Sequence, residues 1–269
     1  LSPHQRAHLN DGGIMLIALS TLKALPLFST LTQEESALIT QNSRMRQCGR
    51  GQFVFMHGEP ITHFYVICRG TVQIFRETPD GHEVTSDMLI AGDVINANEI
   101  IAEQSHHGGL HGMNARTVDD AMLLAIPVGW IKANLNHLDH ISSHLMAGLS
   151  NRLHSAQIEA EHQSTMTATQ IVACFLQRLC VLYGFNPEGF ELPYSKTLIA
   201  SRLRMELATF SRTLSRLKEE GISVEGTHVV FTDTQKTGRF EYDKCSLSEG
   251  CPAHRQLHKN TAKTLGYNA

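Results

Sequence analysis

The feature that most constrains the fold is a series of short apolar runs separated by glycines between Gly51 and Gly92. The runs cover residues 53–55, 64–67 and 72–75, and a glycine follows roughly every eleven residues. Short strands joined by tight turns predict a sandwich, a barrel or a roll. Asp80-Gly81 is the strongest hairpin signal, and we expect a type I′ turn in which both residues have a positive φ.

The flanking segments complete a predicted sensing domain over residues 14–128. Helical spacing of apolar residues between Ile14 and Ser43, broken at Pro26, predicts two short helices. Residues 121–126 form an apolar run that ends at Pro127 and predict a closing strand. A loop rich in histidine and glycine precedes that strand.

A proline-free segment from Trp130 to His162 predicts one long helix within residues 129–163. Its apolar residues keep three- and four-residue spacing and form a narrow stripe, at Leu138, Ile141, Leu145, Leu149, Leu153 and Ala156. Such a stripe favours a seam between two helices, so we expect a parallel homodimer. The alternative is a core helix packed on its own sensing domain.

Residues 164–233 contain the pattern that is most informative about function. After an amphipathic helix over residues 168–183, a short helix over 195–203, a turn at 204–206 and a second helix over 207–220 predict a helix-turn-helix. Residues 221–231 predict a two-stranded wing. Six basic residues face three acidic residues between Tyr194 and Glu220, although the whole chain has a net charge of -3. This local positive charge favours a DNA phosphate backbone as partner.

The second helix would enter the major groove, where an arginine near its start can pair with a guanine. Arg212 is the candidate for that contact, and Ser211 is the candidate for a further hydrogen bond. Thr209 shares the polar stripe, and we expect phosphate contacts from Lys196, Arg202 and Arg216. The alternative is that these residues form the solvated faces of a small helical subdomain.

From Leu22 to Asp233 the chain resembles the superfamily of the cyclic-AMP receptor and the fumarate/nitrate-reduction regulator, the Crp/Fnr regulators. The matching residues are Gly51 to Phe55, Gly58-Glu59, Phe64-Tyr65, Gly70-Thr71-Val72, Phe75-Arg76, Gly81-His82-Glu83, Gly92-Asp93 and Thr209-Phe210-Ser211-Arg212. The resemblance implies an α+β chain with a cyclic-nucleotide-binding-like β-roll, a long dimerisation helix and a winged helix-turn-helix. It also implies double-stranded DNA, a second copy of the chain and RNA polymerase as partners.

Three departures from the family pattern limit which effector and which operator can be carried over. The Arg-Ser pair that cradles the phosphate of cyclic AMP has only Arg116-Thr117 as a counterpart, so cyclic AMP is disfavoured. No cysteine precedes Cys48, which excludes the N-terminal iron–sulfur cluster of oxygen-sensing relatives. Ala208 stands where many members carry a glutamate, and the usual half-site is therefore altered.

The remaining resemblance is to regulators of denitrification that respond to nitric oxide and depend on haem, and it rests on Thr209 to Arg212 and on Phe75 to Gly81. We therefore expect sensing of nitric oxide or of redox state through haem, with an axial ligand among His106, His107 and His111. Arg116 and Thr117 complete the predicted effector site. Alternatively, this loop is exposed and polar, and helix histidines are the ligands (His137, His140, His144 and His154). Another small molecule, a nucleotide or thiol oxidation stays open as the signal.

Residues 234–269 form a polar tail with four residues of the types that bind zinc: Cys245, Cys251, His254 and His258. The gap between its cysteines is longer than in most structural zinc sites, so a redox disulfide or a mobile tail are the alternatives. The other cysteines (Cys48, Cys68, Cys174 and Cys180) are expected in cores.

Composition narrows the remaining classes of protein. No apolar run is long enough to span a membrane and no basic segment introduces a leader, so we expect a cytoplasmic protein. No catalytic triad, phosphate loop or paired-carboxylate motif is present, so an enzyme is not expected. A cyclic-nucleotide-binding module that regulates a partner protein is the alternative from another class, but it has no use for a basic recognition helix.

Overall fold

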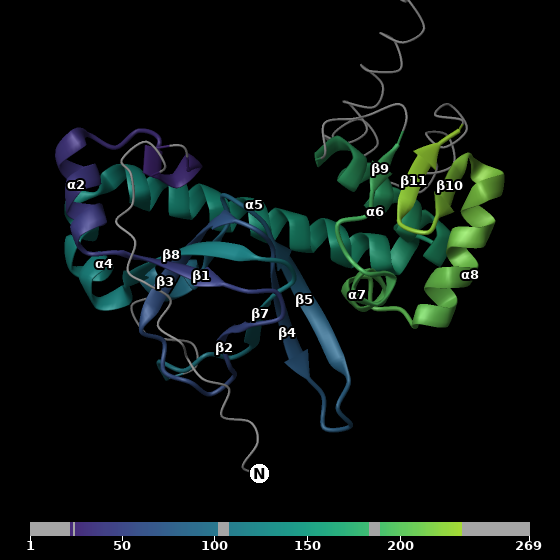
Figure 1. The fold of residues 1–269 in the computed structure, drawn as a ribbon, viewed down its shortest axis with the longest axis horizontal. Helices are drawn as coiled ribbons and strands as arrows, with labels where there is room; N and C mark the ends of the chain where they lie inside the picture. Colours follow the sequence, from purple (N-terminus) through teal and green to yellow (C-terminus); the bar gives the residue numbers. More distant parts are fainter. Residues whose placement is uncertain (1–21, 24, 102–107, 183–188, 233–269) are drawn as a thin grey trace, which may run out of the picture. The chain divides into compact units, whose positions relative to one another are not determined.

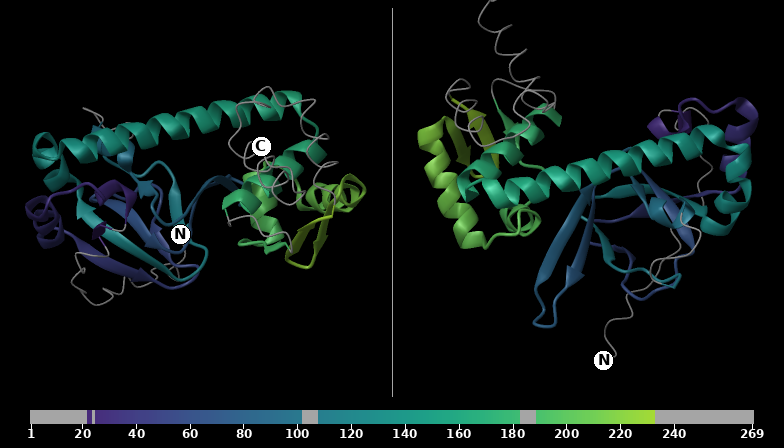
Figure 2. Two further views of the ribbon diagram at one scale, coloured as in Figure 1. Left: turned by 90° about the horizontal axis from the view of Figure 1, so that it is seen from above. Right: turned by 180° about the vertical axis from the view of Figure 1, so that it is seen from behind.

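The computed structural model describes residues 22–23, 25–101, 108–182 and 189–232. The chain divides into two compact units between Leu153 and His154, and each unit is described by itself. Figures 1 and 2 show the elements of both units. None of the described helices is both long enough and apolar enough to cross a bilayer.

The first unit is a β-roll made of two four-stranded antiparallel sheets (Figure 1). One sheet has the order β1-β8-β3-β6, with β1 at Arg44–Cys48, β8 at Ala121–Pro127, β3 at His63–Arg69 and β6 at Val94–Ile95. The other has the order β2-β7-β4-β5, with β2 at Phe53–Phe55, β7 at Asn114–Thr117, β4 at Val72–Glu77 and β5 at Glu83–Leu89. The predicted strands and closing strand are therefore confirmed.

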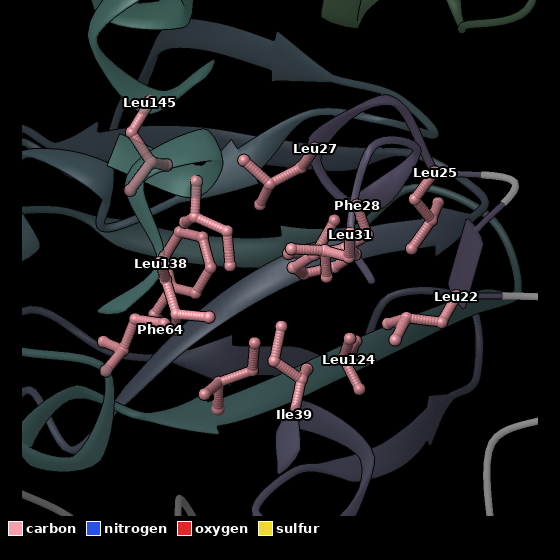
Figure 3. Packing of buried hydrophobic residues seen from close by; sticks show 14 of the residues in the cluster. Leu22, Leu25, Leu27, Phe28, Leu31, Ile39, Phe64, Leu124, Leu138 and Leu145 are labelled. Carbon is pink, nitrogen blue, oxygen red and sulfur yellow. The ribbon is translucent and has the colours of Figure 1, made fainter. Parts of the chain in front are cut away.

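Strand β3 is apolar over most of its length because both of its faces are buried. Tyr65 and Ile67 point into the roll, where they meet side chains of the second sheet such as Phe55. Phe64 and Val66 point to the opposite side, which is covered by helices. These helices are η2 (Pro26–Phe28), α2 (Gln33–Gln41), α3 (Ala97–Ile101), α4 (Val128–Asn134) and the start of α5 (Asp139–Thr165). Figure 3 shows this second core.

The hairpin between β4 and β5 is confirmed, but its predicted turn type is wrong. Only Gly81 has a positive φ, of 84°, and Asp80 does not. The Gly81 N–H donates to the Thr78 carbonyl (2.9 Å), and the Thr78 N–H donates to the His82 carbonyl (2.9 Å). Pro79 fixes the φ that a type I turn needs after Thr78, so a longer loop ending in a left-handed glycine replaces the two-residue turn.

The single helix predicted over residues 130–162 is interrupted. Helix α4 ends at Asn134, a 3-10 turn η3 covers Leu135–His137, and α5 begins at Asp139. Leu138, Ile141 and Leu145 are buried in the helix-covered core of the β-roll, as the alternative for this helix required. Farther along α5, Leu153 is 62% exposed. The stripe therefore serves the roll in its first half only.

The second unit contains α6 (Ala168–Leu182), α7 (Lys196–Arg202), α8 (Leu207–Leu217) and the 3-10 turn η4 (Lys218–Glu220). Strands β10 (Ile222–Glu225) and β11 (His228–Phe231) form the predicted wing. A third strand that the sequence did not indicate, β9 (Phe190–Glu191), pairs with β11. The winged helix-turn-helix is confirmed with a three-stranded sheet.

Candidate nucleic-acid interface and effector region

The tight turn between α7 and α8 is held by its backbone. The Met205 N–H donates to the Ala200 carbonyl (3.0 Å), and the Arg204 N–H donates to the Ser201 carbonyl (3.1 Å). Arg204 adopts a left-handed φ of 57°, which ends α7 and redirects the chain into α8. Ser195 begins α7 by accepting a hydrogen bond from the Leu198 N–H (3.2 Å).

Helix α8 has one buried and one exposed face. The buried face holds Phe210, Thr213, Leu214 and Leu217. The exposed face holds Leu207, Ala208, Ser211, Arg212, Ser215 and Arg216. The two charged residues of this helix are thus both exposed, on the face that does not touch the protein core.

The predicted base-reading residue Arg212 lies back along α8 toward the start of the helix. Its Nε donates to the Ala208 carbonyl (3.3 Å), and its Nη2 donates to the Thr209 hydroxyl (3.2 Å). These contacts are exposed and long, so little free energy opposes their exchange for a base edge. Thr209 is half-buried and orients Arg212. Lys196 is half-buried in the first turn of α7.

Arg202 has a different partner from the phosphate that the sequence suggested. Its Nη1 and Nη2 donate to the two carboxylate oxygens of Glu159 on α5, at 2.9 and 2.7 Å. The Arg202 side chain is 18% exposed. Glu159 drew no notice in the sequence because it is one of several polar residues on a long helix.

The wing is also held by a residue that the sequence did not single out. Glu191 on β9 accepts hydrogen bonds from the Thr227 hydroxyl (2.5 Å) and from His228 Nδ1 (3.0 Å). The bond from Thr227 lowers the pKa of Glu191 below its ordinary value, and His228 lowers this pKa further. Glu191 therefore ties the turn of the wing to β9.

In the predicted effector region, Arg116 is neutralised within the protein. Both of its terminal nitrogens bind Glu83, with Nη1 at 2.8 Å from Oε1, and Nη2 also donates to Gln73 (3.0 Å). Its guanidinium carbon lies 4.7 Å from the ring centroid of Phe75. A phosphate would have to displace a bidentate carboxylate, so the structure gives Arg116 a packing role in place of the predicted anion-binding role.

Thr117 likewise supports the fold. Its buried hydroxyl donates to the Gly49 carbonyl (2.6 Å) and accepts from the Gln52 N–H (3.0 Å). These bonds close the turn between β1 and β2. The predicted effector role of Thr117 is therefore not supported by its surroundings.

His111 is the one histidine of the predicted ligand set that lies in the described residues. Its side chain is 5% exposed and stacks on Phe55, with ring centroids 3.5 Å apart and an angle of 7° between the planes. His106 and His107 lie outside the described residues, as do Cys245, Cys251, His254 and His258. Within residues 22–232, the described parts contain no group of three or more metal-binding side chains that could hold an ion.

Comparison with known proteins identifies both units. Residues 45–133 match the family described as "Cyclic nucleotide-binding domain", and residues 171–236 match "Crp-like helix-turn-helix domain". The chain is 26% identical over 205 residues to the fumarate and nitrate reduction regulatory protein of Vibrio cholerae, covering 74% of this chain and 80% of the relative. It is 25% identical over 210 residues to the anaerobic regulatory protein of Pasteurella multocida, covering 77% and 75%.

Solved structures share the fold. A CooA mutant from Carboxydothermus hydrogenoformans matches with a TM-score of 0.66 at 18% identity, over 85% of this chain and 98% of that one. FixK2 from Bradyrhizobium japonicum matches with a TM-score of 0.62 at 20% identity, over 73% and 96%.

Proposed function

The chain belongs to the Crp/Fnr family of transcription regulators, and on that premise we propose that it is an effector-gated, sequence-specific DNA-binding protein that reads its operator with α8. The observation that carries this proposal is the exposed face of α8, on which Ser211, Arg212 and Arg216 lie opposite a mostly apolar buried face. A helix with this division of residues fits the major groove of B-DNA.

The two arginines have different roles in this proposal. Arg212 is near the start of α8, where it can offer two donors to O6 and N7 of a guanine. Arg216 lies one turn later and binds a phosphate, which sets the register of the helix. Ala208 presents a methyl group in place of the carboxylate of many family members, so selection for a cytosine or adenine amino group is lost at that position.

Selection from a random-sequence duplex library tests this function for every operator sequence at once. We expect a two-fold symmetric sequence to be enriched, and the Arg212→Ala variant to lose about 1–3 kcal/mol with relaxed specificity at one base pair. Arg216→Ala should weaken all duplexes alike and lower the salt slope of log K by about 1. Failure to enrich any sequence at low salt would refute the proposal.

A homodimer through α5 is part of the proposal. Met146 and Leu153 are 58% and 62% exposed, lie seven residues apart and have Leu149 between them. This is the spacing of a coiled-coil seam, shifted by one residue at its start because Leu145 is used by the roll. Leu153→Asp should convert a dimer into a monomer in sedimentation velocity, whereas a control on the same helix, Gln157→Asp, should leave the dimer intact. RNA polymerase remains the proposed partner at the promoter.

Sensing of nitric oxide or redox state through haem is a proposal that now depends on His106 and His107. The described residues fit a haem poorly, because His111 is buried against Phe55 and Arg116 is held by Glu83. Titration with haem under reducing, anaerobic conditions decides the question. A stoichiometric Soret band that is lost in a His106→Ala, His107→Ala double variant would support haem binding, and the absence of a specific band would refute it. A zinc site in the tail is proposed separately and is tested by metal analysis of the purified chain.

The other signals are less well supported by the surroundings of their residues. A nucleotide phosphate lacks a free cation at Arg116, which is bound to Glu83. Thiol oxidation at the β-roll cysteines is disfavoured because burial raises the pKa of Cys48 and raises that of Cys68 to about 11, which suppresses the reactive thiolate. A module that acts only on a partner protein would not require the exposed arginines of α8.

A further inference from the structure

The C-terminal part of α5, residues 154–165, contacts the helix-turn-helix through a fork of hydrogen bonds. Glu159 receives both terminal nitrogens of Arg202, at 2.9 and 2.7 Å, so that the two planar groups meet side by side. A bidentate pair of this kind fixes the mutual orientation of its two side chains in addition to attracting them. The pair is also partly shielded, since the Arg202 and Glu159 side chains are 18% and 31% exposed.

A second contact lies one turn later on the same helix. Gln163 Nε2 donates to the carbonyl of Leu203 (3.3 Å), which is the C-cap residue of α7. Carbonyls at the end of a helix have no partner within the helix, so a side-chain donor is useful there. Glu159 and Gln163 therefore hold two consecutive residues, Arg202 and Leu203, at the end of α7.

The end of α7 is the point from which α8 is directed. Only the residues from Leu203 to Glu206 separate the two helices, and Arg204 is fixed in the left-handed conformation. Ala200 of α7 is buried, as is Phe210 of α8, and the two helices pack on each other. Because the turn is short and constrained, a rotation of α7 about its contact with α5 must carry α8 with it.

We propose that Glu159 is a positioning residue for DNA recognition: it clamps α7 through Arg202 and so sets the direction in which α8 presents Arg212. Arg202 accordingly acts inside the protein and not on a DNA phosphate. Arg178 of α6 approaches the same carboxylate at 3.8 Å but is 43% exposed, so it adds charge without fixing geometry. The inference rests on the proposed DNA-binding function.

The test uses the full chain and a duplex enriched by the wild-type protein. Glu159→Gln and Arg202→Gln should each lower the affinity for that duplex about tenfold, and the double variant should lose no more than either single variant, because both remove the same interaction. The salt slope of log K should stay at its wild-type value in these variants. Arg216→Gln, in contrast, should lower this slope by about 1.

Two further variants separate positioning from phosphate contact and from misfolding. Arg202→Lys keeps the charge but lacks the planar fork, so it should lose affinity several-fold as a clamp, whereas a phosphate contact would tolerate lysine. Arg178→Gln is the matched control and should bind almost as the wild type does. Thermal unfolding establishes that each variant is folded before it is scored.

The outcomes for the clamp and for the function are distinct. If no duplex is enriched by the wild type, the DNA-binding function fails and the clamp fails with it. If a duplex is enriched but Arg202→Gln lowers the salt slope by about 1, or the Glu159 and Arg202 losses add, the clamp is overturned and the function stands.

Discussion

Replacement of Gly70 by alanine tests the close approach on which the β-roll is built. Gly70 joins β3 to β4 with a φ of 86°, and a Cβ placed on it would lie 2.7 Å from the Asp120 carbonyl oxygen and 2.7 Å from Ala121 Cα. Both atoms belong to the backbone, which cannot rotate away. Gly58 is a matched control, because its φ of 83° is nearly the same and no atom lies within 4 Å of its added Cβ.

The two positions separate the conformational cost from the steric cost. Alanine in the left-handed region costs about 1–2 kcal/mol at either site. At Gly70 the overlap with the backbone should add about 1–3 kcal/mol, as in other overpacked interiors. We therefore expect Gly70→Ala to lose about 2–5 kcal/mol of the free energy of unfolding and Gly58→Ala to lose about 1–2 kcal/mol.

Urea unfolding followed by fluorescence is the assay, because the chain has a single tryptophan. Trp130 lies on α4 and packs against the helix-covered core of the β-roll, so its emission reports this unit. With a slope near about 2 kcal/mol per molar urea, the difference between the variants corresponds to a midpoint shift of about 0.5–1.5 M. Equal midpoints for the two variants would refute the reasoning from the backbone overlap.

Three other predictions concern the β-roll. Thr117→Val keeps the shape of the side chain but leaves polar groups of the turn at residues 49–52 without a partner, so the free energy of unfolding should fall by about 1–3 kcal/mol in the fluorescence assay; an unchanged value would contradict the role of the hydroxyl. Cys68, with its pKa raised to about 11, should react slowly with iodoacetamide at about pH 8 in the folded protein and quickly in urea, as followed by mass spectrometry; equal rates would contradict its burial. Burial raises the pKa of Asp93, so its carboxyl group favours folding below its ordinary pKa and opposes it above the raised one; Asp93→Asn should therefore gain stability relative to the wild type as pH rises from about 3 to 7, and a constant difference would exclude this titration.

Much of the fold was predictable because its signals are local. The apolar runs of β3 and β8, and glycines such as Gly70 at corners with a positive φ, depend only on neighbouring residues. The amphipathic pattern of α8 likewise placed Arg212 and Arg216 on its exposed face. Errors arose where local signals compete, as at the β4–β5 turn, in which Pro79 extends the loop.

The roles of individual polar side chains were not predictable in the same way, because their partners are distant in the chain. Arg116 pairs with Glu83 across 33 residues, Arg202 with Glu159 across 43, and the Thr117 hydroxyl meets Gly49 across 68. The charge of an arginine is evident from the sequence, but whether that charge is free for DNA or an effector depends on which carboxylate the fold brings beside it. The sequence by itself thus determined the two units and the exposed face of the recognition helix, through periodicity and backbone constraints. Only the tertiary structure decided which cations are neutralised internally, because long-range packing selects the partners of each side chain.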